Sequence, residues 1–170
     1  MRVALLSAGP SLSSSFHPDA APHDVRIGVN TAASLFACDW WSCADQHRFA
    51  EIEPVGTPRL FTIDAEYHKM QSRNGDKVAK FEVQGWKSVF ADVSAPSIWQ
   101  NFSATSALVL ARWLGATHLD VYGVDMTGVT CCAGETMAPQ RKQSRWERER
   151  DLWAEIVNWL PFPVVRHGVQ

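Results

Sequence analysis

The sequence predicts one α/β domain with a Rossmann-like, three-layer fold and a mostly parallel sheet. Short apolar or β-branched runs alternate with helical patterns along the 170 residues, and short loops join them. This alternation is typical of βαβ units, whose helices cover both faces of a parallel sheet. The length fits a single domain spanning residues 1–170, since domains commonly run about 100–200 residues.

Strand patterns recur at six places between turn-forming residues. Residues 3–8 form a short apolar run that Gly9 and Pro10 end, which indicates a buried strand. Pro163 favours an edge position for the last of the six strands. The other five segments alternate apolar and polar residues or are rich in β-branched and aromatic ones: 25–30, 39–44, 59–63, 118–124 and 162–166.

Helical patterns occupy three segments. Residues 32–37 form a short helix, and residues 103–114 carry apolar residues at helical spacing, with Asn101 or Ser103 as the expected cap. Residues 143–159 form a charged amphipathic helix.

The middle of the chain, residues 64–95, is polar and weakly patterned. It contains the turn signal Asn-Gly-Asp at 74–76, and residues 88–90 fit one short strand. We expect an inserted loop or lid in this segment.

Charge and cysteine content narrow the class of protein. The net charge of −2 argues against a protein that coats nucleic acid. No apolar run reaches the roughly 18 residues that a membrane span needs, and the N-terminal run fits a buried strand better than an export signal. We therefore expect a cytoplasmic protein, without a membrane span and with reduced thiols. Eight tryptophans are compatible with a self-association surface, and hence with a homo-oligomer.

The cysteines do not predict a metal site. Their spacing matches no standard zinc framework, and neighbouring cysteines rarely bridge each other because the geometry is strained. The four are Cys38, Cys43, Cys131 and Cys132.

Ligands of parallel α/β sheets bind at the carboxyl ends of the strands, where polar residues of this chain gather. The turn from Gly9 to Leu12 follows the first strand and could form an anion-binding nest of backbone amides or an ordinary tight turn. Asn30 ends the second strand and Asp45 the third. Each could bind a nucleotide or sugar hydroxyl, or cap the helix that follows.

Further candidates follow later in the chain. Ser103 opens a helix, where a phosphate can bind and where a cap is also expected. Asp125 follows the strand at 118–124 and could hold a divalent cation, act as a base or orient a loop. Arg145 and Arg148 could clamp a diphosphate, or belong to a solvated helix face with i,i+4 pairs.

Three blocks, residues 3–12, 24–46 and 102–126, carry short motifs in a distinctive order. They are Gly-Pro-Ser-Leu after the first strand, Gly-Val-Asn at the end of the second, and Tyr-Gly-Val-Asp late in the chain. This combination resembles the family that groups bacterial sialyltransferases with motility-accessory glycosyltransferase-like proteins and archaeal 6-hydroxymethylpterin diphosphokinase-like proteins. The resemblance implies a Rossmann-like fold that holds a nucleotide or nucleotide-sugar.

The resemblance also implies roles for individual residues. It places Gly9, Pro10, Ser11 and Asn30 on the nucleotide, and Ser103 at the donor phosphates. Sialyltransferases of this kind use a histidine base after the last shared strand.

Five more positions take their meaning from the same resemblance. Leu12 ends the first motif and Gly123 belongs to the last, so both join the candidate nucleotide-binding residues. Ala104 joins them and stands where the family often has glycine. Ala8 stands where the family has asparagine, which argues against a sialic-acid donor. The histidine of this chain in the region of the family's base is His167.

Taken together, the sequence predicts a small nucleotide-sugar-dependent glycosyltransferase-like enzyme. Asp125 and His167 are its candidate catalytic residues, and the acceptor stays open. The alternatives are a non-catalytic nucleotide-binding or sequestering protein, a diphosphokinase-like enzyme that uses ATP and magnesium, and a structural protein that kept the fold.

Overall fold

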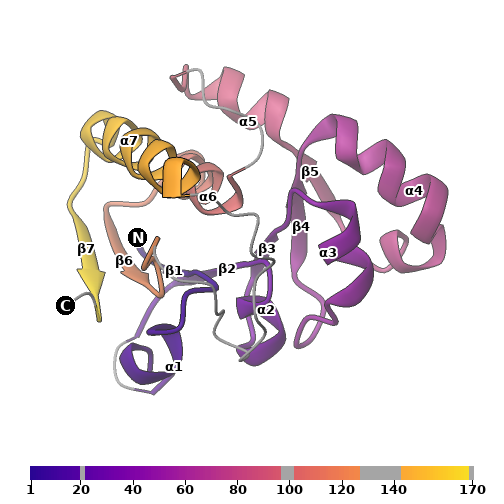
Figure 1. Cartoon of the computed structure of the whole chain (residues 1–170), viewed down its shortest axis with the longest axis horizontal. Helices are drawn as coiled ribbons and strands as arrows, with labels where there is room; N and C mark the ends of the chain where they lie inside the picture. The colour runs from indigo at the N-terminus through magenta and orange to yellow at the C-terminus, as the bar shows by residue number, and fades with distance from the viewer. Residues whose placement is uncertain (20–21, 97–101, 127–142, 169–170) are drawn as a thin grey trace.

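The computed structural model describes residues 1–19, 22–96, 102–126 and 143–168, and the side chains of residues 143–145 lie outside this description. Its strands form one sheet in the order β5-β4-β3-β2-β1-β6-β7 (Figure 1). Every neighbouring pair is parallel, which confirms the predicted α/β, Rossmann-like fold. The strands are β1 (Arg2–Leu6), β2 (Val25–Val29), β3 (Trp40–Ser42), β4 (Arg59–Thr62), β5 (Val83–Gly85), β6 (His118–Tyr122) and β7 (Val164–His167).

Helices lie on both faces of this sheet, as the alternation of side chains along the strands requires (Figure 1). Val3 and Leu5 of β1 point to the face that α5, α6 and α7 cover. Ala4 and Leu6 point to the opposite face, where they pack with Leu12 of α1. The helices are α1 (Leu12–Ser15), α2 (Ala32–Leu35), α3 (Gln46–Glu51), α4 (Asp64–Val78), α5 (Trp86–Asp92), α6 (Ser103–Trp113) and α7 (Gln143–Trp159).

Helix α6 is the most deeply buried helix of the described chain. Every residue from Ser103 to Ala111 is buried, because α6 lies against the sheet and in contact with α5 and α7. A helix that is buried on nearly all sides needs such neighbours around it. Among the residues that the structure describes, no helix is both long enough and apolar enough to cross a membrane.

Residues 64–95 differ from the sequence-based expectation of a loop or lid. The segment forms α4, β5 and α5, and β5 is the edge strand next to β4. The strand expected at 88–90 is wrong, because these residues belong to α5. The turn signal remains only as a kink inside α4, where Asn74 has φ −138° and ψ 40°. Met70 and Val78 are the buried residues of α4, too few to give a clear helical period.

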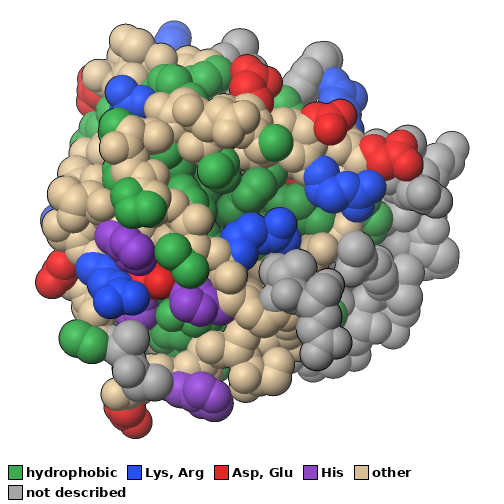
Figure 2. Space-filling model, turned by 90° about the vertical axis from the view of Figure 1, so that its left-hand side faces the viewer, with side chains coloured by type: hydrophobic (Ala, Val, Ile, Leu, Met, Phe, Trp, Pro, Cys, Tyr) green, Lys and Arg blue, Asp and Glu red, His purple; other side chains and the backbone are tan. Residues whose placement is uncertain are grey.

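A buried carboxylate, Asp120 of β6, connects the edge strand β7 to the sheet interior. Arg2 Nε donates to Asp120 Oδ2 at 2.6 Å, and His167 Nε2 of β7 lies 2.8 Å from Oδ1. The Nε2 atoms of His23 and His118 lie 3.2 and 3.5 Å from the same carboxylate. Figure 2 shows histidine side chains grouped beside cationic ones on the face that β7 forms.

The surroundings of Asp120 keep it ionised. Burial acts to raise the pKa of this carboxyl, but hydrogen bonds from Arg2 and His167 and the charges of Arg2 and His118 outweigh that effect. They hold the pKa well below its ordinary 3.8. Because the folded pKa lies below the unfolded one, the ionised group stabilises the fold above about pH 3.8 and loses that contribution as the pH falls.

We predict that Asp120→Asn lowers the free energy of unfolding by about 2 kcal/mol at about pH 5, because it weakens charge-assisted hydrogen bonds. At about pH 3 the difference from the wild type shrinks, since the unfolded wild-type carboxyl is then mostly protonated. Urea denaturation at the two pH values measures the effect. Asp19→Asn, an exposed change, serves as the control, and a pH-independent difference would contradict the prediction.

Candidate functional site

A cavity of about 350 Å³ lies at the carboxyl ends of the central strands. Its walls come from the loops after β1, β2, β3 and β6, from the start of α6, and from side chains of α4 and α7. This is the edge at which parallel α/β sheets bind ligands, and it includes the point between β1 and β6 where the strand order changes direction.

At this point the loop after β6 is bound to the loop after β1. The Gly9 N–H donates to the Gly123 carbonyl at 2.8 Å. Ser11 donates twice to Asp125, from its N–H to Oδ2 at 2.9 Å and from Oγ to Oδ1 at 2.5 Å. Both carboxylate oxygens of Asp125 therefore hold the turn, which supports the loop-orienting alternative for this residue.

The close approach of the two loops requires glycine on each side. A Cβ on Gly9 would overlap the Gly123 carbonyl oxygen and the Asp125 carboxylate. Gly123 has φ +69°, and a Cβ there would lie 2.5 Å from the Ser7 carbonyl oxygen and 2.8 Å from the Leu12 Cβ. Gly9 of the Gly-Pro-Ser-Leu motif and Gly123 of the Tyr-Gly-Val-Asp motif thus allow the two loops to touch.

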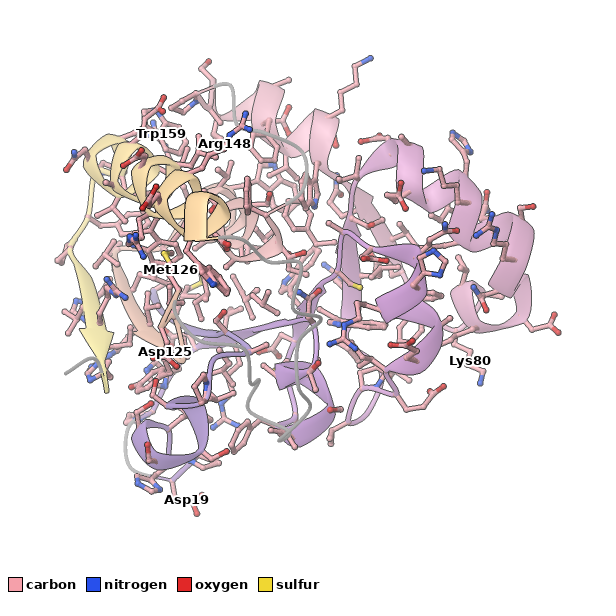
Figure 3. The ribbon with its side chains drawn as sticks, viewed as in Figure 1. Asp19, Lys80, Asp125, Met126, Arg148 and Trp159 are labelled. Atoms are coloured by element: carbon pink, nitrogen blue, oxygen red, sulfur yellow. The ribbon has the colours of Figure 1, made fainter. Side chains whose placement is uncertain are left out.

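Two guanidinium groups hold the carbonyls on either side of Asp125. Arg166 of β7 donates to the Val124 carbonyl, and Arg150 of α7 donates to the Met126 carbonyl at 3.3 Å. Figure 3 shows Met126 next to α7 and Asp125 next to α1. Helix α7 and strand β7 therefore fix the loop that forms this end of the cavity.

Asn30 stands on the cavity wall at the end of β2 with a left-handed backbone, φ 48°. Its N–H donates to the Ser42 carbonyl at 3.0 Å, and its carbonyl accepts from Trp41 Nε1 at 3.2 Å. The side-chain Oδ1 is buried and accepts no hydrogen bond from any described residue. Helix α2 has no side-chain cap, so the capping alternative for Asn30 is wrong. A buried amide oxygen without a partner can be satisfied by a polar ligand.

Ser103 joins the start of α6 to the end of β3. Its Oγ accepts from the Ala44 N–H at 3.2 Å, and its carbonyl accepts from Ser42 Oγ at 3.0 Å. The expected cap is wrong for Ser103, because Phe102 holds the cap position and no side chain bonds there. Asn101, the other expected cap, lies outside the described residues. A hydroxyl that accepts a bond still has a proton to donate, and Ser103 and the adjacent Ala104 line the cavity.

Asp45 caps α3, as one of its two alternatives predicted. Its Oδ1 accepts from the His47 N–H at 2.8 Å and from the Arg48 N–H at 3.4 Å. Asp45, His47 and Arg48 also line the cavity, so this cap brings an imidazole and a guanidinium to its wall.

The lining contains further charged side chains that the sequence did not reveal. Arg48 pairs with Glu51 at 3.0 Å, and Lys69 of α4 pairs with Glu66 at 2.5 Å. Glu149 of α7 lines the cavity and is itself buried. Arg48, Glu66 and Lys69 were missed because α3 and α4 have sparse apolar patterns. Glu149 could have been noticed, because it occupies a position in the apolar stripe of α7.

Several predicted residues lie away from the cavity. Ser11 and Leu12 do not line it, and Leu12 is fully buried in the core. His167 belongs to the Asp120 cluster, outside the lining. Arg148 is exposed, and Figure 3 shows it on the side of α7 turned away from Asp125. The side chain of Arg145 lies outside the described residues.

The described residues offer neither a reactive thiol nor a metal site. Burial raises the pKa of the Cys38 and Cys43 thiols to about 12, which keeps them protonated and unreactive. In the parts of the chain that the structure describes, no group of three His, Cys, Asp or Glu side chains could hold a metal ion. Cys131 and Cys132 lie outside these parts.

The architecture is that of an α/β protein with a cavity at the switch point of its sheet, and solved structures share this fold. No model of a known protein family matches the sequence, and no curated protein matches it. The sialyltransferase CST-II, in complex with a trisaccharide acceptor and CMP, superposes with a TM-score of 0.61 at 9% identity over 99% of this chain and 81% of that one. CstII from Campylobacter jejuni, in complex with the substrate analogue CMP-3FNeuAc, gives 0.59 at 12% identity over 98% and 81%. At these identities the similarity shows a shared fold and no more.

We predict that Ser11 and Asp125 act as one unit. In a double-mutant cycle, Ser11→Ala and Asp125→Asn should show a coupling of about 1–2 kcal/mol in urea denaturation, because the first change removes the short hydrogen bond and the second removes the charge that strengthens it. Ser13 is exposed on α1, so Ser13→Ala should be additive with Asp125→Asn. Additive effects of Ser11→Ala and Asp125→Asn would refute the coupling.

We also predict that Gly123→Ala destabilises the fold by at least about 2 kcal/mol, since the residue needs a positive φ and has no room for a Cβ. Gly75→Ala is the matched change. No atom lies within 4 Å of its added Cβ, and alanine favours a helix over glycine by about 0.8–1 kcal/mol. The free energies of unfolding of the two variants test the contrast. If Gly123→Ala and Gly75→Ala change the free energy of unfolding equally, the loops after β1 and β6 can move apart without cost.

Proposed function

We propose that this chain binds a nucleotide-sugar in the cavity at the carboxyl ends of β6, β1, β2 and β3, and that it is a glycosyltransferase-like enzyme. The observation that carries the proposal is Asn30, whose buried amide oxygen has no described partner and which stands on the wall of that cavity. The shared fold supports it, since the similar solved sialyltransferases hold CMP or a CMP-sugar analogue.

The predicted nucleotide-binding residues divide into two groups in this proposal. Gly9, Pro10, Asn30 and Ser103 line the cavity and offer backbone groups, an amide and a hydroxyl to the nucleotide. Ser11, with Leu12 beside it, keeps the turn in shape through Asp125 rather than touching the ligand.

The described lining also suggests which cations meet an anionic ligand. Arg48 and Lys69 lie on the wall formed by α3 and α4, whereas Arg148 points away from the cavity. Carboxylates outnumber these two cations in the lining, since Asp45, Glu66, Asp125 and Glu149 belong to it. A nucleotide monophosphate, as in a CMP-sugar, brings less negative charge into such a site than a nucleoside diphosphate or triphosphate. We therefore infer that a CMP-type donor fits the cavity better than ATP.

We predict a thermal shift with CMP that exceeds the shifts with UDP, GDP and ATP. At about 100 times the dissociation constant, a ligand adds roughly 2.7 kcal/mol of stability. Asn30→Gly should raise the CMP dissociation constant by about 3–10-fold, because it removes the amide and keeps a residue that tolerates the positive φ. The fitted dissociation constants of variant and wild type give the measurement.

Asn74→Gly is the matched control, since it removes an amide from α4 outside the cavity lining and should bind CMP like the wild type. Absence of a shift with any nucleotide, on protein that unfolds cooperatively, would overturn the proposal. If Asn30→Gly and Asn74→Gly weaken CMP binding equally, the CMP site does not lie at Asn30. A CMP shift without release of nucleotide from any donor would leave the non-catalytic binding protein as the function.

A further inference from the structure

Two buried oxygens on the cavity wall accept no hydrogen bond from any described residue. One is Asn30 Oδ1, and the other is Gln46 Oε1, which also belongs to the lining. Elsewhere in the described chain, the buried side-chain nitrogens and oxygens without a partner belong to residues outside the lining. A buried polar atom without a partner costs free energy, so most such atoms in proteins have one. Two of them on one cavity point to a ligand that supplies the missing hydrogen bonds.

Both oxygens come from neighbouring parts of the cavity wall. Strands β2 and β3 are parallel neighbours, with Val29 opposite Ser42. The Asn30 N–H donates to the Ser42 carbonyl at 3.0 Å, which keeps Asn30 beside the end of β3. Gln46 is the first residue of α3, directly after the loop that follows β3. A single small ligand group at the ends of β2 and β3 therefore lies between the two residues.

The chemistry of these oxygens restricts which part of a nucleotide they meet. The oxygen of a side-chain amide only accepts hydrogen bonds, so the ligand has to provide O–H or N–H groups. A phosphate group, which is ionised at neutral pH, offers acceptors and does not satisfy them. The backbone N–H groups of His47 and Arg48, at the start of α3, are already taken by Asp45. This part of the wall thus suits the nucleoside and not the phosphate.

We propose that Asn30 and Gln46 accept hydrogen bonds from the two ribose hydroxyls, so that the site selects a ribonucleotide over a deoxyribonucleotide; this rests on the proposed function. The ribose carries two O–H donors on adjacent carbons, which match two acceptors from adjacent loops. In dinucleotide-binding α/β folds, an acidic side chain about 20 residues after the glycine turn accepts from a ribose hydroxyl. Asn30 follows Gly9 by 21 residues and offers an acceptor oxygen at the end of β2. Gln46 is then the second residue that determines this specificity.

The test compares the binding of CMP, 2′-deoxy-CMP, 3′-deoxy-CMP and UMP to the full chain by isothermal titration calorimetry. The wild type should bind each deoxy analogue about 3–10-fold more weakly than CMP, because each analogue leaves one amide oxygen without a partner. Gln46→Met keeps the length of the side chain and removes the acceptor. This variant should bind CMP about 3–10-fold more weakly and lose the preference against one of the two analogues. Asn30→Gly should lose the preference against the other analogue.

Two further variants control for effects on folding and charge. Gln71→Met changes an exposed glutamine of α4 outside the cavity lining and should keep every wild-type preference. Gln46→Glu keeps an acceptor, since a carboxylate also accepts from a hydroxyl. It should therefore keep the preference for CMP over both deoxy analogues, while its negative charge weakens the binding of all of them alike. This variant decides the matter if Gln46→Met folds poorly.

The possible outcomes separate this inference from the proposed function. Equal binding of CMP and both deoxy analogues by the wild type would overturn the inference and leave the nucleotide site intact. Unchanged preferences in Gln46→Met, or their loss in Gln46→Glu, would also overturn it. If Gln46→Met loses a preference between CMP and UMP and keeps those against the deoxy analogues, Gln46 contacts the base and the ribose assignment is wrong. A wild type that binds none of these nucleotides would instead overturn the proposed function.

Discussion

The bond between Ser11 and Asp125 joins the two halves of the sheet at their carboxyl edge. To one side of β1 the strands run outward through β2, β3, β4 and β5, and to the other side through β6 and β7. At the switch point of an open α/β sheet the loops usually separate and leave a crevice. Here two hydrogen bonds to one carboxylate and the Gly9–Gly123 contact hold these loops together. The cavity therefore has a fixed wall at this point, and its opening extends along β1, β2 and β3 toward α3 and α4.

The sequence predicted the fold well for those strands and helices whose buried residues repeat at the regular spacing of the element. β1, β2 and β6 lie inside the sheet, are mostly buried, and were found within two residues of their ends. Helix α6 was found because its buried positions repeat at helical spacing. Helix α4 was missed because it covers the sheet near an edge, where Met70 and Val78 suffice to hold it. A pattern with so few buried positions cannot be told from a loop.

The sequence predicted where the residues of the candidate site lie better than it predicted what each of them does. The rule that ligands bind at strand ends found Gly9, Asn30, Asp45 and Ser103, and each lies on the cavity wall. It did not show that Asp125 would be used internally. Contacts between residues that are 114 positions apart, such as Ser11 and Asp125, leave no trace in a single sequence. Asp120 and Glu149 illustrate the same limit, because nothing in the sequence shows that the first lies beside Arg2 and His167 and the second on the cavity wall.

Strand β7 lies at the edge of the sheet, yet it contacts two groups in the interior. Successive residues of a strand point to opposite faces, so Arg166 reaches the Val124 carbonyl in the cavity loop while His167 reaches Asp120. The strand β7 therefore contacts both the loop on the cavity wall and the buried carboxylate of β6. A change at this outer edge of the sheet is passed on to the cavity wall through these two contacts. A fluorophore or affinity tag attached just beyond β7 would sit a few residues from both contacts. A label at the other edge, on β5, would leave the same loop undisturbed and is the better place to immobilise or follow this protein.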